Sequence, residues 1–171
     1  MQNAWTGVAH VFGDAIDTDV IIPGKYTKSL DFNAMKRHTL KEITNDFSGK
    51  CKLGDFVVAG HDFGIGSSRE QAPLVLKLCG IRCIVAKSFS RIFYRNAINL
   101  GLYLVQCNTD GISDGDVLSY DPPTGTLTNQ CNGKTYIGQP LPDIMQRILE
   151  HGGIVPYIMD LRLEGKDMTL E

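Results

Sequence analysis

The glycine-rich segment at residues 60–71 (GHDFGIGSSREQ) constrains the fold of this chain more than any other stretch. It follows an apolar run at residues 54–60 that is typical of a buried strand, and it precedes a helical pattern of apolar residues that Gly80 closes. Three glycines within residues 60–66 allow positive φ angles and let the backbone approach a ligand closely. Two serines and an arginine follow at once, so the segment predicts a strand, loop and helix that together bind an anion.

The start of this helix is open to two interpretations. Ser67 with Glu70, and Ser68 with Gln71, have the spacing of a capping box. Pro73 fits a first helical turn but removes a hydrogen bond further in, so the helix either begins near Glu70 or is kinked at the proline. From these residues alone, an anion site and a simple capped helix with a surface arginine remain alternatives.

The composition is typical of a globular protein with one domain, spanning residues 1–171. The chain is 43% apolar and 21% charged, and its 17 basic and 19 acidic residues give a net charge of −2. Both signs are scattered, which excludes a basic patch for nucleic acid. The chain begins with no signal-peptide pattern, and no apolar run approaches the ~20 residues that span a bilayer. We therefore expect a cytoplasmic protein with no nucleic-acid or membrane partner.

The cysteines favour buried free thiols over disulfides or a metal site. They are odd in number, widely spaced and mostly within apolar runs. They are Cys51, Cys79, Cys83, Cys107 and Cys131. The closest two, Cys79 and Cys83, lack the C-x-x-C spacing and have no histidine nearby in the sequence, so we expect no metal site within this chain.

The N-terminal third predicts a strand, an acidic turn and a helix. The strand covers residues 5–12, and the three aspartates at 14–19 lack the glycine and the closing glutamate of an EF-hand loop, so we interpret them as a turn with one functional aspartate. A cationic loop at 23–29 precedes a helix that begins near Asp31. One face of this single helix would carry Phe32, Met35, Thr39, Ile43 and Phe47, with His38 beside it as a packed or surface residue.

The rest of the chain alternates helices and short strands. After the glycine segment, a helix would bury Leu74, Val75, Leu78 and Cys79. Further helices are predicted at 90–100 and 142–151, and strands at 82–86, 102–105, 117–120, 126–129 and 134–137, with a hairpin at 121–125 and a short tail at 154–163. The centre implies parallel pairing and the C-terminal third antiparallel pairing, so the fold class is mixed α/β.

The glycine segment fails three common motifs at defined positions. Ser67, Ser68 and Arg69 occupy the places where a dinucleotide fingerprint needs its third glycine. No Gly-Lys-Ser/Thr of a P-loop is present, and the Gly-x-Ser-x-Gly of a nucleophile elbow is incomplete. What remains is a serine on glycine-rich backbone two residues before an arginine, which suits binding a carboxylate or stabilising an oxyanion.

Three ordered blocks of sequence stand out: residues 17–23 (DTDVIIP), 63–70 (FGIGSSRE) and 88–102 (SFSRIFYRNAINLGL). Together they resemble the small subunits of 3-isopropylmalate dehydratases and, more broadly, the swivel domain of the aconitase superfamily. The resemblance extends from about Gly13 into the C-terminal tail. It implies a swivelling β/β/α three-layer domain with a mixed sheet. It also implies a hydro-lyase that isomerises 2-isopropylmalate and 3-isopropylmalate by dehydration and rehydration, in leucine biosynthesis.

The same resemblance implies a heteromeric enzyme. In the family, a separate large subunit carries a [4Fe-4S] cluster whose open iron binds the substrate hydroxyl as a Lewis acid. We therefore expect no cofactor in this chain, activity only with the large subunit, and a small di- or tricarboxylate as substrate.

Carried over by position, Ser67 resembles the general base that removes a proton from the carbon next to a carboxylate, and Arg69 resembles a carboxylate anchor. A serine is too weak a base unless its alkoxide is stabilised, for which backbone N–H groups at the helix start and Arg69 are the expected source. Gly66 and Ser68 would bind substrate through the backbone, Ser68 by its N–H more than its hydroxyl. Asp19 resembles an active-site aspartate that orients its neighbours.

Two further groups are ambiguous in the resemblance. Arg91, Arg95 and Asn96 either brace the site or serve helix packing. Relatives often have Asn, Cys and His where this chain has Asp62, Ile65 and Gln71, which puts the detailed hydrogen bonding in question.

Substrate choice depends on the loop at residues 24–29, in which Lys25, Tyr26 and Lys28 are the expected substrate contacts. An isopropyl group predicts an apolar residue here, whereas loops of the homoaconitase type carry an arginine near position 28 for an extra carboxylate. Lys28 either pairs with such a carboxylate or is a solvated surface lysine. The alternatives are therefore a small subunit of homoaconitase or of a dimethylmalate-type dehydratase and, from a different class, a non-catalytic anion-binding module.

Overall fold

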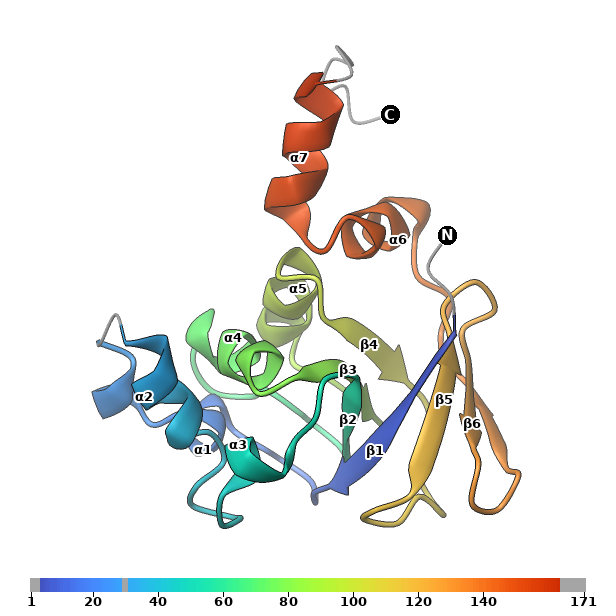
Figure 1. Cartoon of the computed structure of the whole chain (residues 1–171), viewed down its shortest axis with the longest axis horizontal. Coiled ribbons are helices and arrows are strands. Elements are labelled where there is room, and N and C mark those ends of the chain that lie inside the picture. The colour runs from blue at the N-terminus through green and yellow to red at the C-terminus, as the bar shows by residue number, and fades with distance from the viewer. Residues whose placement is uncertain (1–3, 29–30, 164–171) are drawn as a thin grey trace.

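The computed structural model describes residues 4–28 and 31–163, and within these residues the strands form one seven-stranded mixed sheet (Figure 1). The sheet order is β4-β3-β2-β1-β5-β6-β7. The strands are β1 (Trp5–Val11), β2 (Asp55–Ala59), β3 (Ile81–Ala86), β4 (Tyr103–Gln106), β5 (Val117–Asp121), β6 (Thr126–Asn129) and β7 (Thr135–Ile137). The mixed sheet confirms the predicted α/β class.

Strand β1 joins a parallel half to an antiparallel half. Its second part pairs in parallel with β2, with Ala9 opposite Phe56, while its first part pairs antiparallel with β5, with Trp5 opposite Tyr120. Strands β2 to β4 continue the parallel half and β5 to β7 the antiparallel half. All five residues of β2 are buried, as expected of a parallel strand covered on both faces, whereas β6 and β7 alternate buried and more exposed residues.

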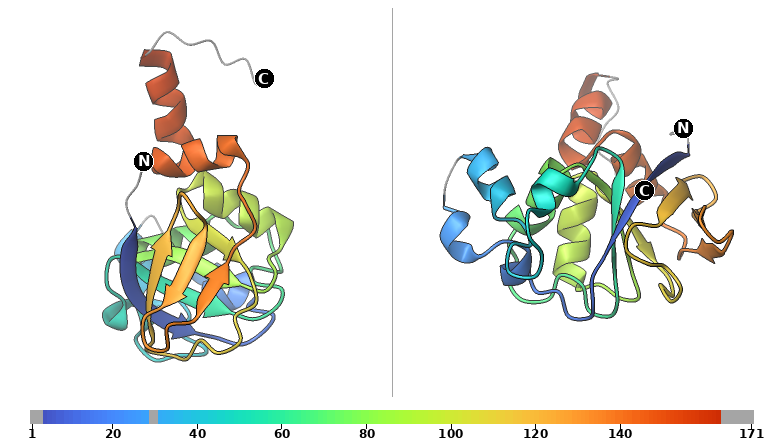
Figure 2. Two further views of the ribbon diagram at one scale, coloured as in Figure 1. Left: turned by 90° about the vertical axis from the view of Figure 1, so that its right-hand side faces the viewer. Right: turned by 60° about the horizontal axis from the view of Figure 1, so that its bottom comes forward.

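Helices cover the parallel half and extend the domain at one end (Figures 1 and 2). They are α1 (Thr18–Ile21), a 3-10 helix (Gly24–Tyr26), α2 (Phe32–Arg37), α3 (Phe47–Lys50), α4 (Gln71–Leu78), α5 (Arg91–Asn99), α6 (Asp143–Glu150) and α7 (Ile154–Leu163). Helix α4 lies between α2 and α5 and contacts both. Helix α4 also packs against β3, and α5 packs against β4. Helix α7 projects from α6, at the end of the domain away from α1 (Figure 2).

A buried carboxylate on β2 accepts hydrogen bonds from β1. The Asp55 side chain accepts hydrogen bonds from the Val8 amide at 2.9 Å and the Lys52 amide at 2.8 Å, and it lies 3.0 Å from Nε2 of His10. Because Asp55 is only 3% exposed, these partners replace the water that the carboxylate loses on folding.

The predicted single helix that begins near Asp31 is wrong. Helix α2 ends at Arg37 and α3 begins only at Phe47, and the chain between them takes left-handed conformations at Leu40 (φ 53°) and Asp46 (φ 50°). The Leu40 amide donates to the Ile21 carbonyl at 2.9 Å, so a contact with α1 stabilises the turn. The expected stripe is divided: Met35, Thr39 and Phe47 are buried, but Phe32 and Ile43 are about half exposed.

Other expectations need smaller corrections. Residues 154–163 form helix α7 and not a tail, and its Val155, Met159 and Leu163 are largely exposed. Helix α4 buries Ala72, Pro73, Val75 and Leu76, whereas the expected Leu74 and Leu78 are only half buried. The predicted strands and the helices at 90–100 and 142–151 are confirmed to within about two residues at each end.

All five cysteines are free thiols, as predicted, but they are not all buried. Cys79 and Cys83 are buried, Cys51 and Cys107 half buried, and Cys131 exposed. Within residues 4–28 and 31–163, no group of three or more His, Cys, Asp or Glu side chains could hold a metal ion. No described helix is long and apolar enough to cross a membrane.

Candidate active site

The glycine segment lies where three loops meet at the carboxyl edge of the parallel strands. It leaves β2 and pairs on both sides with the other two blocks, through isolated parallel bridges between Asp17 and Ile65 and between Phe63 and Phe89. The loops after β1, β2 and β3 are thus joined by backbone hydrogen bonds. The carboxyl edge of parallel strands is the usual place for a ligand site in open α/β sheets.

Two of the glycines are required by the geometry. Gly64 has φ 78°, and a Cβ there would lie 2.2 Å from the Phe93 ring. Gly66 has φ 102°, and a Cβ there would lie 2.7 Å from the Asp17 carboxylate. Both have the positive φ that the sequence predicts, but the groups that approach them are the chain's own side chains, Phe93 on α5 and Asp17 in the acidic turn, and not a ligand.

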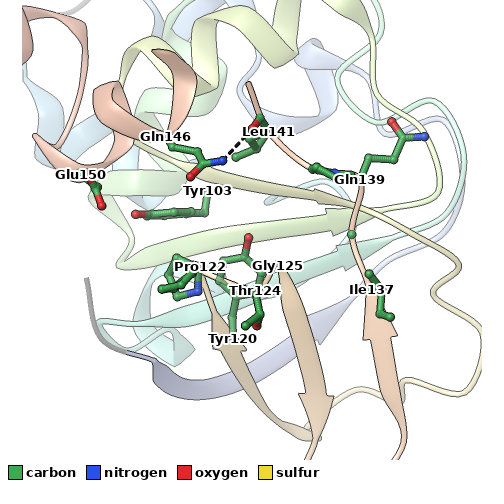
Figure 3. Close-up of a pocket in the computed structure, with 13 residues that line it drawn as sticks. Tyr103, Tyr120, Pro122, Thr124, Gly125, Ile137, Gln139, Leu141, Gln146 and Glu150 are labelled. Carbon is green, nitrogen blue, oxygen red and sulfur yellow. Dashed lines mark hydrogen bonds between the residues drawn. The ribbon is translucent and has the colours of Figure 1, made fainter. Parts of the chain in front are cut away.

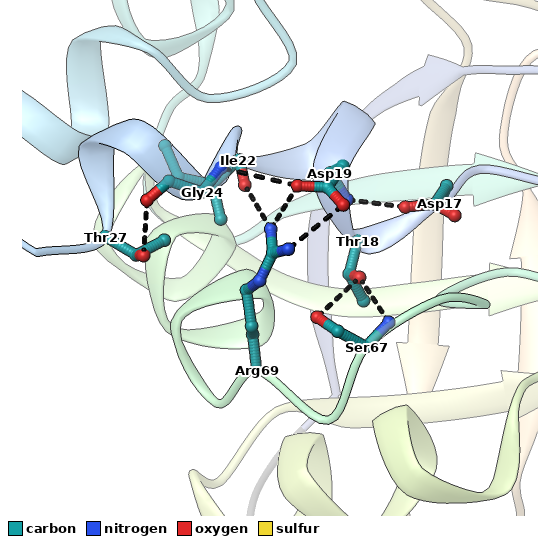
Figure 4. Close-up of polar contacts among 8 residues, drawn as sticks. All are labelled: Asp17, Thr18, Asp19, Ile22, Gly24, Thr27, Ser67 and Arg69. Carbon is teal, nitrogen blue, oxygen red and sulfur yellow. Dashed lines mark hydrogen bonds and ion pairs between the residues drawn. The ribbon is translucent and has the colours of Figure 1, made fainter.

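Ser67 is held by a single buried threonine (Figure 4). Its amide donates to Oγ1 of Thr18 at 3.0 Å, and its own Oγ lies 3.3 Å from the same atom. Thr18 is only 1% exposed and is the first residue of α1, which Asp17 caps. Since Thr18 Oγ1 already accepts the amide hydrogen, its own proton can be donated to Ser67 Oγ. Sequence pattern alone does not single out Thr18, although this residue lies within the first block of family resemblance, residues 17–23.

The serine hydroxyls do not cap the following helix. Helix α4 begins at Gln71 after an N-cap Glu70 that makes no side-chain capping bond, so the capping-box interpretation is wrong. Pro73 falls in the first turn, which decides the earlier ambiguity in favour of a start near Glu70. Among the described residues, the amides of Ser68 and Arg69 have no acceptor, and they remain available to a bound anion.

Arg69 and Asp19 form a two-pronged ion pair (Figure 4). Nη1 bonds to Oδ1 and Nη2 to Oδ2, the latter at 3.0 Å, and Nη1 also reaches the Ile22 carbonyl at 3.5 Å. The hydrogen bond from Arg69 holds the pKa of the Asp19 carboxyl below its ordinary value. The pair orients the guanidinium while leaving Arg69 Nε without an acceptor in the described part of the chain.

The loop after α1 starts beside this pair and then turns outward. The Gly24 amide donates to Asp19 Oδ1 at 3.3 Å. Tyr26 stacks on the His38 ring with centroids 3.6 Å apart and an interplanar angle of 4°, and the Lys25 ammonium lies 5.0 Å from the Tyr26 ring centroid. Desolvation, followed by the nearby cations Lys41, Arg37 and Lys25, lowers the pKa of His38, which packs as predicted.

Within the described residues, Lys25, Tyr26 and Lys28 form no hydrogen bond with Ser67, whose partner is Thr18. Lys28 is exposed and has no ion pair within the described residues, and residue 29 of the same loop lies outside them. Asn96 does reach the site, since its amide nitrogen donates to the Ser68 carbonyl at 3.2 Å.

Two hollows lie outside the Ser67 loop. One of about 340 Å³ lies between the β5–β6 hairpin and α6, near Tyr103 and Leu141, and no residue of the glycine segment lines it (Figure 3). A second, of about 300 Å³, is lined by Phe89, Arg91, Tyr94, Arg95 and Gln106. The second borders the loop after β3, which contacts the glycine segment.

A family model and two sequence relatives agree on the kind of protein that this chain resembles. Residues 46–109 match the model of the aconitase C-terminal domain. The chain is 46% identical over 154 residues to a 3-isopropylmalate dehydratase small subunit of Caldicellulosiruptor bescii, which covers 89% of this chain and 93% of the relative. It is 49% identical over 157 residues to small subunit 1 of the same enzyme from Archaeoglobus fulgidus, covering 91% and 98%.

A solved structure agrees with the sequence relatives. The crystal structure of 3-isopropylmalate dehydratase (leuD) from Methanocaldococcus jannaschii superposes with a TM-score of 0.90 at 43% identity, covering 95% of this chain and 97% of that one.

Proposed function

The chain belongs to the family of 3-isopropylmalate dehydratase small subunits, and we propose that it supplies the proton-transfer half of their active site. Such an enzyme is a hydro-lyase that interconverts 2-isopropylmalate and 3-isopropylmalate in leucine biosynthesis. The observation that supports these roles is that Ser67 contacts the buried Thr18 hydroxyl, while the next residue of α1, Asp19, pairs with Arg69.

Ser67 is the proposed general base. In the dehydration step its oxygen accepts the proton from the carbon next to a substrate carboxylate, while hydroxide leaves the neighbouring carbon and a double bond forms. In rehydration the serine gives this proton to the carbon that lost hydroxide, and hydroxide adds to the carbon that lost the proton, so the hydrogen and the hydroxyl exchange places. The Thr18 hydroxyl, by donating a hydrogen bond to Ser67 Oγ while keeping its proton, stabilises the serine alkoxide that this chemistry needs.

Arg69 is the proposed carboxylate anchor. Asp19 already engages both terminal nitrogens, so the guanidinium is held in one plane before substrate arrives. Arg69 Nε and the backbone amides of Ser68 and Arg69, which have no acceptor within the described residues, offer hydrogen-bond donors to a substrate carboxylate. Electrostatic groups fixed in advance in this way avoid reorganisation during the reaction.

The partner is a large subunit, which we propose carries the [4Fe-4S] cluster. The described part of this chain offers no group of three or more metal ligands, and burial raises the pKa of Cys51 to about 12 and that of Cys107 to about 11, which disfavours their thiolates. The cluster supplies Lewis-acid activation of the substrate hydroxyl. Free thiols suit the reducing cytoplasm, which we propose as the location.

The test is reconstitution with the large subunit. Ser67→Ala should lower kcat by about 10²–10⁴-fold while the two chains still co-purify in the same ratio. The matched control is Ser119→Ala on β5, a similarly half-buried serine in the antiparallel half, which should retain full kcat. Full turnover by Ser67→Ala would remove serine from the base role.

Two further results separate the remaining alternatives. Turnover by the isolated chain would contradict a shared active site, and a wild-type pair without turnover would favour an anion-binding module. Comparison of kcat/KM for 3-isopropylmalate, homocitrate and dimethylmalate then identifies the substrate, because specificity is the ratio of these constants.

A further inference from the structure

Two arginines on α5 share the hollow of about 300 Å³ described above. Arg91 and Arg95 are one helical turn apart and both exposed, and no carboxylate in the described ranges forms an ion pair with either. Like charges at this spacing repel each other, so the pair does not stabilise α5. The arrangement therefore favours an anionic group that comes from outside the chain.

The walls of the hollow suit a carboxylate on a protein segment. Phe89 and Tyr94 are partly buried aromatic side chains with their rings 5.8 Å apart, and Gln106 adds an amide at the end of β4. An aromatic surface excludes water from a docked segment, and guanidinium groups bind carboxylates with two parallel hydrogen bonds. Arginine and aromatic residues are the side chains most enriched at protein interfaces.

The hollow lies beside the active site but is distinct from it. Phe89 pairs with Phe63 of the glycine segment, and Asn96, next to Arg95 on α5, donates to the Ser68 carbonyl. Neither arginine forms an ion pair or hydrogen bond with Ser67, Thr18, Asp19 or Arg69 in the described structure. A partner that completes the site at Ser67 must approach this same edge of the sheet.

We propose that the arginine hollow, formed by Phe89, Arg91, Tyr94, Arg95 and Gln106, docks a carboxylate-bearing segment of the large subunit. The inference rests on the proposed function, because it takes the large subunit as the occupant. Docking there would place the partner against the helix that holds Ser68, so assembly and the geometry of the Ser67 loop would be coupled through Asn96.

The test is the double variant Arg91→Gln/Arg95→Gln, titrated against the large subunit. Its Kd for assembly should rise by about 10–100-fold, and the salt dependence of Kd should weaken, since two charge-assisted contacts are lost. At saturating variant subunit, kcat should stay within about twofold of wild type, because the arginines do not contact the reacting atoms. The matched control is Arg147→Gln/Arg162→Gln, which makes the same charge change at exposed positions on α6 and α7.

Several outcomes decide the inference. An unchanged Kd overturns it, and a reduced kcat/KM in the same variant would then assign the arginines to the substrate. Arg91→Lys/Arg95→Lys should recover part of the affinity, because lysine keeps the charge without the bidentate geometry. Assembly is measured without turnover, so failure of the proposed function, seen as full activity in Ser67→Ala, is separate from failure of the docking site.

Discussion

The hydroxyl oxygen of Thr18 accepts the amide hydrogen of Ser67 at 3.0 Å and lies 3.3 Å from its Oγ. One buried side chain thus positions both the backbone and the hydroxyl of the proposed base. The contact joins residues 49 positions apart, and it exists because β1 and β2 pair in parallel and bring the loops that follow them to one edge.

Thr18→Val tests this positioning role. Valine has nearly the same shape, so the fold should persist, but the Ser67 amide loses its acceptor and Oγ loses its donor. We expect kcat to fall by about 10–100-fold and the free energy of unfolding to fall by about 1 kcal/mol. The rise of kcat with pH should also move to higher pH, because an unsupported serine hydroxyl has a higher pKa.

The control for this prediction is Thr18→Ser, which keeps the hydroxyl and should retain most activity with the original pH profile. A Thr18→Val enzyme that loses stability but keeps the wild-type pH profile would show that the contact serves folding alone.

The pair of Asp19 and Arg69 leads to a prediction about KM. Arg69→Lys replaces a planar two-pronged donor by a point charge, so we expect KM for 3-isopropylmalate to rise by about 10–100-fold, with a smaller change in kcat. Asp19→Asn keeps one acceptor oxygen and should raise KM less. Steady-state kinetics of both variants, assembled with the large subunit, check this order.

The pH dependence of this pair has a defined sign. Asp19 has a lowered pKa, so it stays ionised, and the pair stays intact, at any pH above the ordinary range of an aspartate, near 4. A rise in KM between pH 8 and pH 6 that Asp19→Asn abolishes would contradict this assignment.

The local pattern of apolar residues was sufficient to predict those helices and strands whose own residues specify them. Strand β2 is apolar throughout and α5 has a regular buried face of Phe93, Ala97 and Ile98, and both match prediction within about two residues. Leu40 shows the opposite case: a bulky residue at φ 53° is unfavourable locally and depends on the Ile21 carbonyl, which no sequence window contains.

The sequence predicts which residues form the site, but not which residues they contact. Ser67, Arg69 and Asp19 stand in blocks of distinctive sequence, and the structure brings the three together. The spacing of Ser67 and Glu70 favoured a capping box, yet tertiary contact with Thr18 gives that serine a better partner than the helix end. Hydrogen bonds between distant loops depend on strand register, which periodicity alone does not supply.

Lys28 gives a prediction about substrate specificity. It is exposed and without an ion pair in the described residues, so its charge is available to a distal carboxylate. Lys28→Ala should lower kcat/KM for homocitrate about 5–10-fold more than kcat/KM for 3-isopropylmalate, which lacks the third carboxylate. If both constants change by the same factor, Lys28 is a solvated surface lysine.

Asp55 leads to a prediction about stability and pH. Burial alone would raise the pKa of this carboxyl, but the hydrogen bonds from His10 and from the amides of Val8 and Lys52 outweigh it, so the pKa lies below its ordinary value. Asp55→Asn puts an NH₂ group where one of these donors points, and it leaves that donor buried without an acceptor. We expect the free energy of unfolding at pH 7 to fall by about 2–4 kcal/mol, measured by urea unfolding.

The difference between wild type and Asp55→Asn should depend on pH in one direction. The folded pKa of Asp55 is lower than the unfolded value near 3.9, so the carboxylate contributes fully above about pH 5, and its contribution is lost as pH falls through the folded pKa. The two unfolding curves should therefore converge below about pH 4. Glu42→Gln, at an exposed position, serves as the control and should match wild type within about 0.5 kcal/mol at pH 7. An equal gap at pH 3 and pH 7 would mean that Asp55 stabilises the junction of β1 and β2 by shape and not by charge.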